Sequence, residues 1–114
     1  MSAKSYTSII KKAHDKEYFV TLLFFWLNSI ELAKQRVQIR VSEGGHDIPI
    51  DVIERRYSRG LKNFFKIYLP ICDNVMLFDN SNKLPVLVLE KEISEDIKIV
   101  NDYLFNQIKD FKND

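Results

Sequence analysis

Apolar positions divide the first part of the chain into two segments with different periods. In residues 5–16, Tyr6, Ile9, Ile10 and Ala13 recur at the spacing of one helix face. Residues 18–27 (YFVTLLFFWL) are almost continuously apolar and rich in aromatic and β-branched side chains. A strand with one face in solvent alternates, so this run predicts a strand that is buried on both faces, as in a parallel sheet.

Two helices are predicted to follow this strand. Asn28 and Ser29 suit the N-cap of the first helix, which ends at Gly44 and Gly45. Asp51 is the expected cap of the second helix, and Pro70 is expected to end it. A wide apolar stripe follows the second helix, and its aromatic members are assigned to the core: Val52, Ile53, Tyr57, Leu61, Phe64, Phe65 and Tyr68.

The last third of the chain predicts two more strands and a helix. Residues 75–78 (VMLF) and 85–89 (PVLVL) are short apolar runs on the two sides of a turn signal at residues 79–82. Ser94 is the expected cap of a final helix with Ile97, Val100, Leu104 and Ile108 on one face. Since helices separate the strands, we expect one α/β domain over residues 1–114, with a mainly parallel sheet of about three strands flanked by helices.

Composition and charge narrow the possible partners and the compartment. The 114 residues are 46% hydrophobic and 29% charged, which is ordinary for a folded protein, and the formal charge of +1 gives no general attraction to nucleic acid or membrane. The longest apolar run is shorter than the ~20 residues of a membrane helix, and the N-terminus has no signal-peptide core. Cys72 is the only cysteine, and its apolar neighbours indicate a buried structural thiol. We therefore expect a soluble, cytoplasmic protein.

A cluster of arginines is the main candidate for binding chemistry. It stands on the two central helices: Arg36 and Arg40 on the first, and Arg55, Arg56 and Arg59 on the second. A tight turn at residues 44–49 could bring these guanidinium groups together, and guanidinium forks match phosphate oxygens. The alternative is that the arginines are solvated or paired with nearby carboxylates, as exposed arginines commonly are.

Three further polar residues are candidates for ligand contacts. His46 could donate to a phosphate or a ribose, or it could cap a helix. Asn80 and Ser81 follow a predicted strand, at the edge where open α/β sheets bind ligands, so they could contact a nucleotide base or serve only as turn residues. The His and Cys residues are not spaced as a metal site, and no nucleophile–base arrangement or G-x-x-x-x-G-K-[ST] loop is present.

The residues from 24 to 81 resemble the zeta-toxin-like P-loop kinases, a family also described as predicted ABC-type ATPases. The matching pieces are FFWL (24–27), AKQRV (33–37), RV (40–41), GGHDIP (44–49), VIERRY (52–57), LKNFF (61–65), YLP (68–70) and DNS (79–81). The most specific part is the GGHDIP turn followed by Arg55, Arg56 and Tyr57. Residues 5–13 also look like the family's helix before the strand at 18–27, so the resemblance covers nearly the whole chain and fades after about Leu89.

The resemblance implies a P-loop kinase fold that uses ATP and Mg²⁺. It implies that Arg36, Arg40, Arg55 and Arg56, together with His46, contact phosphates in a lid-like region. It also implies that Asn80 and Ser81 lie near the adenine. Zeta toxins are similar to enzymes that phosphorylate UDP-N-acetylglucosamine.

The chain departs from this family in one essential part. The family's Walker A loop, its catalytic acidic residue and its first strands would precede Met1, so no catalytic residue is assigned and we expect no kinase activity from this chain alone. The strand at 18–27 would then lack neighbours, which predicts self-association or pairing with a separately encoded front half. The competing interpretations are a non-catalytic nucleotide- or protein-binding module and an unrelated small α/β protein.

Overall fold

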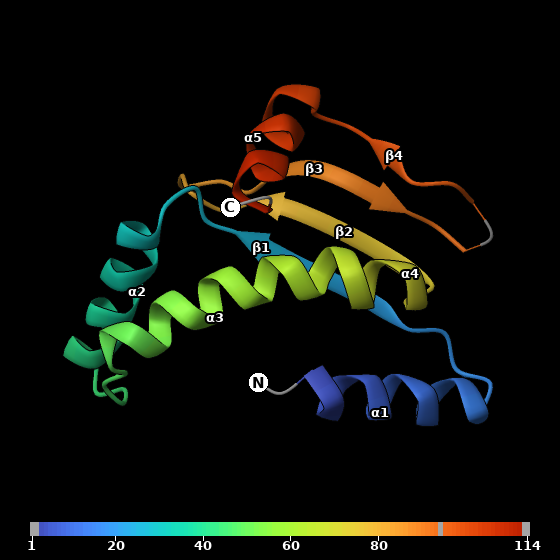
Figure 1. Ribbon diagram of the computed structural model, residues 1–114, viewed down its shortest axis with the longest axis horizontal. Helices are drawn as coiled ribbons and strands as arrows, with labels where there is room; N and C mark the ends of the chain where they lie inside the picture. The colour runs from blue at the N-terminus through green and yellow to red at the C-terminus, as the bar shows by residue number, and fades with distance from the viewer. Residues whose placement is uncertain (1–2, 94, 113–114) are drawn as a thin grey trace.

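The computed structural model describes residues 3–93 and 95–112, which form a sheet with its helices packed mainly on one side (Figure 1). The helical elements are α1 (Ala3–Asp15), α2 (Ile30–Ser42), α3 (Ile50–Asn63), η1 (Phe64–Tyr68), α4 (Leu69–Ile71) and α5 (Asp102–Lys112). The strands are β1 (Thr21–Trp26), β2 (Asn74–Asp79), β3 (Val86–Lys91) and β4 (Lys98–Ile99).

The sheet is mixed, so the expectation of a mainly parallel sheet of about three strands is wrong. Its four strands follow the order β1-β2-β3-β4, and only β1 and β2 are parallel. The pairs β2–β3 and β3–β4 are antiparallel. The connection from Asp79 to Val86 is too short for the crossover that parallel neighbours need, so β3 must return beside β2 as a hairpin.

The final helix begins later than expected, because a short strand precedes it. Ser94, the expected cap, lies outside the described residues, and β4 occupies Lys98–Ile99. The helix α5 starts at Asp102, and the Asn101 side chain accepts a hydrogen bond from the Leu104 amide at 3.0 Å. Asn101 therefore supplies the cap that we had assigned to Ser94.

The first central helix begins as the sequence predicts, whereas the second differs from the prediction at both its start and its end. Ser29 caps α2 by accepting a hydrogen bond from the Leu32 amide at 3.1 Å, as expected. The second helix begins after Pro49, with Asp51 inside its first turn and not at the cap. It continues through the π-helical turn η1 and α4 to Ile71, so Pro70 does not end it.

The core lies between the sheet and the helices α3, η1 and α5. Phe64 of η1 packs on Phe24 of β1 at 4.8 Å between ring centroids, and Ile108 of α5 joins the same buried cluster as Leu77 and Leu89. The most deeply buried side chains, at 0–1% exposure, are Phe64, Val75, Leu77, Val88, Leu89 and Ile108. One cluster therefore anchors the three long strands to their helices.

The other face of the sheet is open to solvent. Leu23 and Phe25 of β1 are 51% and 49% exposed, whereas Trp26, on the covered face, is 2% exposed. Burial on both faces, which the continuous apolar run at residues 18–27 predicted, is therefore wrong for this strand. No helix among the residues described is long and apolar enough to cross a membrane.

Candidate functional site

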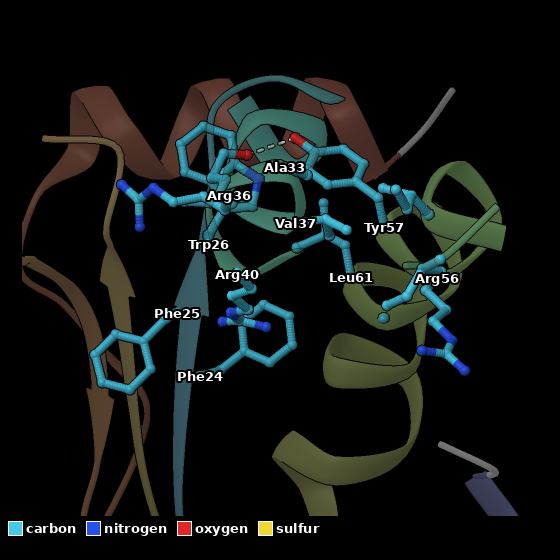
Figure 2. A pocket seen from close by; sticks show the side chains of 14 residues that line it. Phe24, Phe25, Trp26, Ala33, Arg36, Val37, Arg40, Arg56, Tyr57 and Leu61 are labelled. Atoms are coloured by element: carbon cyan, nitrogen blue, oxygen red, sulfur yellow. Dashed lines mark hydrogen bonds between the residues drawn. The ribbon is translucent and has the colours of Figure 1, made fainter. Parts of the chain in front are cut away.

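A hollow of about 350 Å³ lies where the carboxyl end of β1 meets α2 and α3 (Figure 2). We call it the hairpin pocket, since α2 and α3 form an antiparallel pair that projects beyond the sheet (Figure 1). The lining residues are Phe24, Phe25, Trp26, Leu27, Ala33, Arg36, Val37, Arg40, Ile48, Ile53, Arg56, Tyr57, Gly60 and Leu61. The pocket thus joins apolar walls to three arginines.

The α2–α3 turn is built on two glycines with different roles. Gly44 has a φ of 97°, a conformation that ends a helix and that side chains rarely adopt. Gly45 donates its N–H to the Arg40 carbonyl at 2.7 Å, and a Cβ on Gly45 would lie 2.8 Å from that oxygen. Lys34 and Glu54 join the two helices by an ion pair at 3.0 Å. The tight turn expected from the sequence is therefore present.

Tyr57 fixes α3 to the end of β1. Its hydroxyl donates to the Leu27 carbonyl at 2.5 Å (Figure 2). Burial raises the pKa of Tyr57, an interaction with the Trp26 side chain offsets part of this rise, and the nearby Asp79 charge adds to it. Tyr57 therefore acts as a neutral donor that holds the pocket wall. From the sequence we expected Tyr57 in the core, whereas in the structure it lines the pocket.

Arg36 is engaged with the loop after β2. Its guanidinium Nη2 donates to the Asn80 carbonyl at 2.9 Å. The Asn80 amide donates to the Trp26 carbonyl at 2.8 Å, and the Ser81 hydroxyl oxygen accepts from the Asn28 amide at 2.9 Å. These bonds tie α2 and the ends of β1 and β2 together. Arg36, Asn80 and Ser81 thus have structural partners at the position that we proposed for a nucleotide.

Asp79 ends β2 as a buried carboxylate beneath this loop. It is 5% exposed, and its Oδ1 accepts hydrogen bonds from the Ser81 amide at 3.0 Å and from the Ser81 hydroxyl. A carboxylate that accepts two local bonds stabilises the turn that it starts. The Asp79–Ser81 segment is therefore a rigid part of the pocket's surroundings.

The remaining candidate residues do not form a single clamp. Arg40 and Arg56 line the pocket, and neither forms an ion pair with any part of the chain that the structure describes. The side chains of Arg36 and Arg56 point away from each other (Figure 2). His46 is exposed in the connector between the helices and lines neither hollow beside β1, and Arg55 lies in a second hollow.

This second hollow is larger, about 810 Å³, and lies along the first half of β1 between α1 and α3. We call it the edge trough. Its lining residues are Tyr6, Ile9, Ile10, Val20, Thr21, Leu22, Phe24, Arg55, Arg56, Arg59, Gly60, Asn63, Tyr68 and Cys72. Phe24, Arg56 and Gly60 belong to both hollows, so the trough and the hairpin pocket follow one another along β1.

Cys72 borders the trough as a structural thiol. It is 2% exposed, and burial raises its pKa, although the Lys91 charge offsets part of the rise. The expected burial of Cys72 is confirmed, and a thiol with a raised pKa is a poor nucleophile at neutral pH.

The donors present fit phosphate better than they fit a metal. Within residues 3–93 and 95–112, no group of three or more His, Cys, Asp or Glu side chains is placed to hold a metal ion. No Asp or Glu lines the hairpin pocket, whereas Mg²⁺ in proteins takes one or two carboxylates together with substrate phosphates. The guanidinium groups of Arg40 and Arg56 match phosphate oxygens.

Comparisons with known proteins give one partial relative. An uncharacterized protein of Haemophilus influenzae is 32% identical over 57 residues, which is 50% of this chain and 41% of that protein. The matched part thus spans less than half of the relative. No family model matches the chain. No solved structure matches it either.

Proposed function

We propose that this chain is a fragment or remnant of a zeta-toxin-like ATP-dependent kinase, and that its hairpin pocket binds a phosphorylated nucleotide or nucleotide sugar. The support from the sequence is the GGHDIP turn followed by Arg55, Arg56 and Tyr57. The proposal includes a cytoplasmic location and no kinase activity from these 114 residues alone, because they contain no phosphate-binding loop.

The observation that carries the binding proposal is the chemistry of the hairpin pocket. Its walls are apolar and aromatic, and Arg40 and Arg56 stand on them without a carboxylate partner among the described residues. A ligand with a flat ring, whose faces can pack on apolar side chains, and with an anionic group satisfies both features. Nucleotides and nucleotide sugars have this combination.

The pocket residues would divide the work of binding. Arg40 and Arg56 would contact phosphate oxygens, while Arg36 and Tyr57 hold the pocket walls through the Asn80 and Leu27 carbonyls. ATP would supply the transferable phosphoryl group in the family. Since no carboxylate lines the pocket to hold Mg²⁺, we expect binding without transfer.

Calorimetric titration of ATP and of UDP-N-acetylglucosamine, each with Mg²⁺, tests this proposal. We expect saturable binding that Arg40→Ala weakens by about tenfold, the loss of one or two charge-assisted hydrogen bonds. Arg59→Ala is the matched control, because Arg59 lines only the edge trough. Absence of binding at millimolar ligand would overturn the binding proposal. ATP hydrolysis by the wild-type chain that is faster than hydrolysis by the Arg40→Ala variant would overturn the proposed lack of kinase activity.

Association is the second part of the proposal. The expected partners are another copy of the chain or a separately encoded front half, and the features that favour association are the open sheet face and the free edge of β1. Light scattering with size-exclusion chromatography at micromolar protein checks it. A monodisperse monomer that binds no front-half segment would contradict both partners.

A further inference from the structure

The outer edge of β1 has unpaired backbone groups of known position. The Val20 carbonyl accepts from the Asn74 amide and the Trp26 carbonyl accepts from the Asn80 amide, so these even-numbered positions face β2. Because backbone groups alternate along a strand, Thr21, Leu23 and Phe25 direct their N–H and C=O groups to the opposite edge. β1 is the first strand of the sheet, so no described strand pairs with that edge.

The edge trough borders this free edge. The consecutive residues Val20, Thr21 and Leu22 all line it, and neighbours in a strand point to opposite faces of the sheet. A hollow lined by residues of both directions adjoins the backbone of the strand that joins them. Its volume of about 810 Å³ leaves room for several side chains of an added segment.

The charge of the trough is one-sided. Arg55, Arg56 and Arg59 line it, and none of its lining residues is acidic. None of these guanidinium groups forms an ion pair within the described ranges 3–93 and 95–112. The remaining lining is mostly apolar, with Ile9, Leu22 and others. A complementary occupant must combine apolar side chains with carboxylates.

We propose that the edge trough binds an extended peptide segment in which apolar residues alternate with Asp or Glu, and that this segment adds to β1 as a new outer strand. The backbone of the segment would pair with Thr21, Leu23 and Phe25, and its carboxylates would reach Arg55 and Arg59. A segment of about six residues, ~20 Å long, matches the length of β1. A second copy of β1 fits less well, since its sequence TLLFFW has no charge to meet the arginines.

This proposal is separable from nucleotide binding. Arg55 and Arg59 line the trough and not the hairpin pocket, whereas Arg40 lines the pocket and not the trough. The variants that test one site are therefore the controls for the other.

The probe is a synthetic peptide of about eight residues that alternates valine and glutamate, titrated into the full chain by calorimetry and followed by amide chemical shifts. We expect saturable binding, with the largest shifts at Thr21, Leu23 and Phe25. The double variant Arg55→Ser/Arg59→Ser weakens binding by about tenfold or more, whereas Arg40→Ala leaves it unchanged. A valine–lysine peptide of the same length does not bind.

Backbone pairing is tested from both partners. Leu23→Pro removes an N–H that points to the free edge, so it blocks the added strand without loss of a bond to β2. A valine–glutamate peptide with alternate N-methylated amides tests the same pairing on the unchanged chain, even if the proline variant does not fold. Each change is expected to abolish binding.

Three results would overturn the proposal. The first is equal binding of the acidic and basic peptides, and the second is binding that survives N-methylation. The third is that no peptide binds at millimolar concentration. This result includes the case in which a dimer of the chain occupies the edge, which would be recognised because Leu23→Pro dissociates the dimer. That dimer would assign the edge to a second copy.

Discussion

The two faces of the sheet have similar apolar residues and opposite surroundings. On the covered face, Val75, Leu77 and Leu89 are at most 1% exposed. On the open face, Leu23 and Phe25 are about half exposed. Residue type therefore does not determine burial here. What differs is that α3, η1 and α5 contribute Leu61, Phe64 and Ile108 to the core on one face, whereas no described helix packs a buried residue on the other.

Side-chain contacts within the open face limit its exposure only in part. The rings of Phe25 and Phe78 are stacked at 5.3 Å between centroids, which shields one side of each ring. Met76 and Leu87 are half-buried on the same face. A contiguous apolar surface of this kind is a site of association or aggregation in a soluble protein. It adjoins the free edge of β1, so a strand added there would extend the same face.

The largest expected difference between the faces is in stability. Leu77→Ala should lower the free energy of unfolding by about 3 kcal/mol, because it removes a fully buried side chain and leaves a cavity. Leu23→Ala should cost less than about 1 kcal/mol, because half of the Leu23 side chain already lies in solvent. Urea unfolding followed by circular dichroism measures both changes.

Equal losses in these two variants would contradict the comparison. They would mean that Leu23 is as buried as Leu77 in solution, for example because another molecule covers the open face. Repeating the measurement at several protein concentrations separates the cases, since only a covered interface makes stability depend on concentration.

A lysine on each face gives a smaller contrast. The Lys91 amine donates to the Leu69 and Cys72 carbonyls at 2.9 Å each and so caps the end of the long helix. Lys91→Met should cost about 2 kcal/mol, because it leaves these carbonyls without their donor. Lys98→Met should cost less than about 0.5 kcal/mol, because the Lys98 side chain is 74% exposed and its amine lies 4.0 Å from the Glu90 carboxylate. Thermal unfolding of the two variants measures both losses of stability. A Lys98 effect as large as that of Lys91 would refute the capping role.

Local signals predicted the elements best. Ser29 marks the start of α2, and the glycines at 44 and 45 mark its end. The parallel pairing of β1 with β2 follows from the two helices between them. The direction of β3 also follows from the sequence, because the turn after Asp79 is too short for the crossover that a parallel neighbour needs.

Other features depended on contacts that a sequence does not show. The sequence from Ile97 to Val100 is compatible with a helix face or with a strand. It forms the strand β4 because it pairs with β3. The continuous apolar run of β1 gave no sign that only one face receives a helix. For the site, the arginines were placed correctly on the hairpin helices, but the bond from Arg36 to the Asn80 carbonyl spans 44 residues of sequence. Arg40 and Arg55 line different hollows, although both were expected in one clamp.

The smallest expected effect is a pH dependence where α1 meets the start of the sheet. The Asp73 carboxylate accepts from the Val20 amide at 2.7 Å and contacts His14 Nε2 at 2.8 Å. The pKa of Asp73 lies below its ordinary value of 3.8. The main reason is the hydrogen bond from the Val20 amide, and the second is the hydrogen bond with His14. A carboxylate with a lowered folded pKa stabilises the protein fully above the unfolded value, and this stability is lost as pH falls through 3.8 to the folded pKa.

Asp73→Asn should therefore lower stability by roughly 1 kcal/mol at pH 7. The loss is modest because the side chain is partly exposed and because the asparagine can partly replace the hydrogen bond from the Val20 amide. The gap between wild type and variant should narrow as the pH falls below about 4, because protonated Asp73 then resembles asparagine. Thermal unfolding from pH 7 to pH 3 measures the gap, with Asp15→Asn as the exposed control on α1. A gap that widens on acidification would reverse the assigned sign and remove Asp73 as the group that anchors α1 to the sheet.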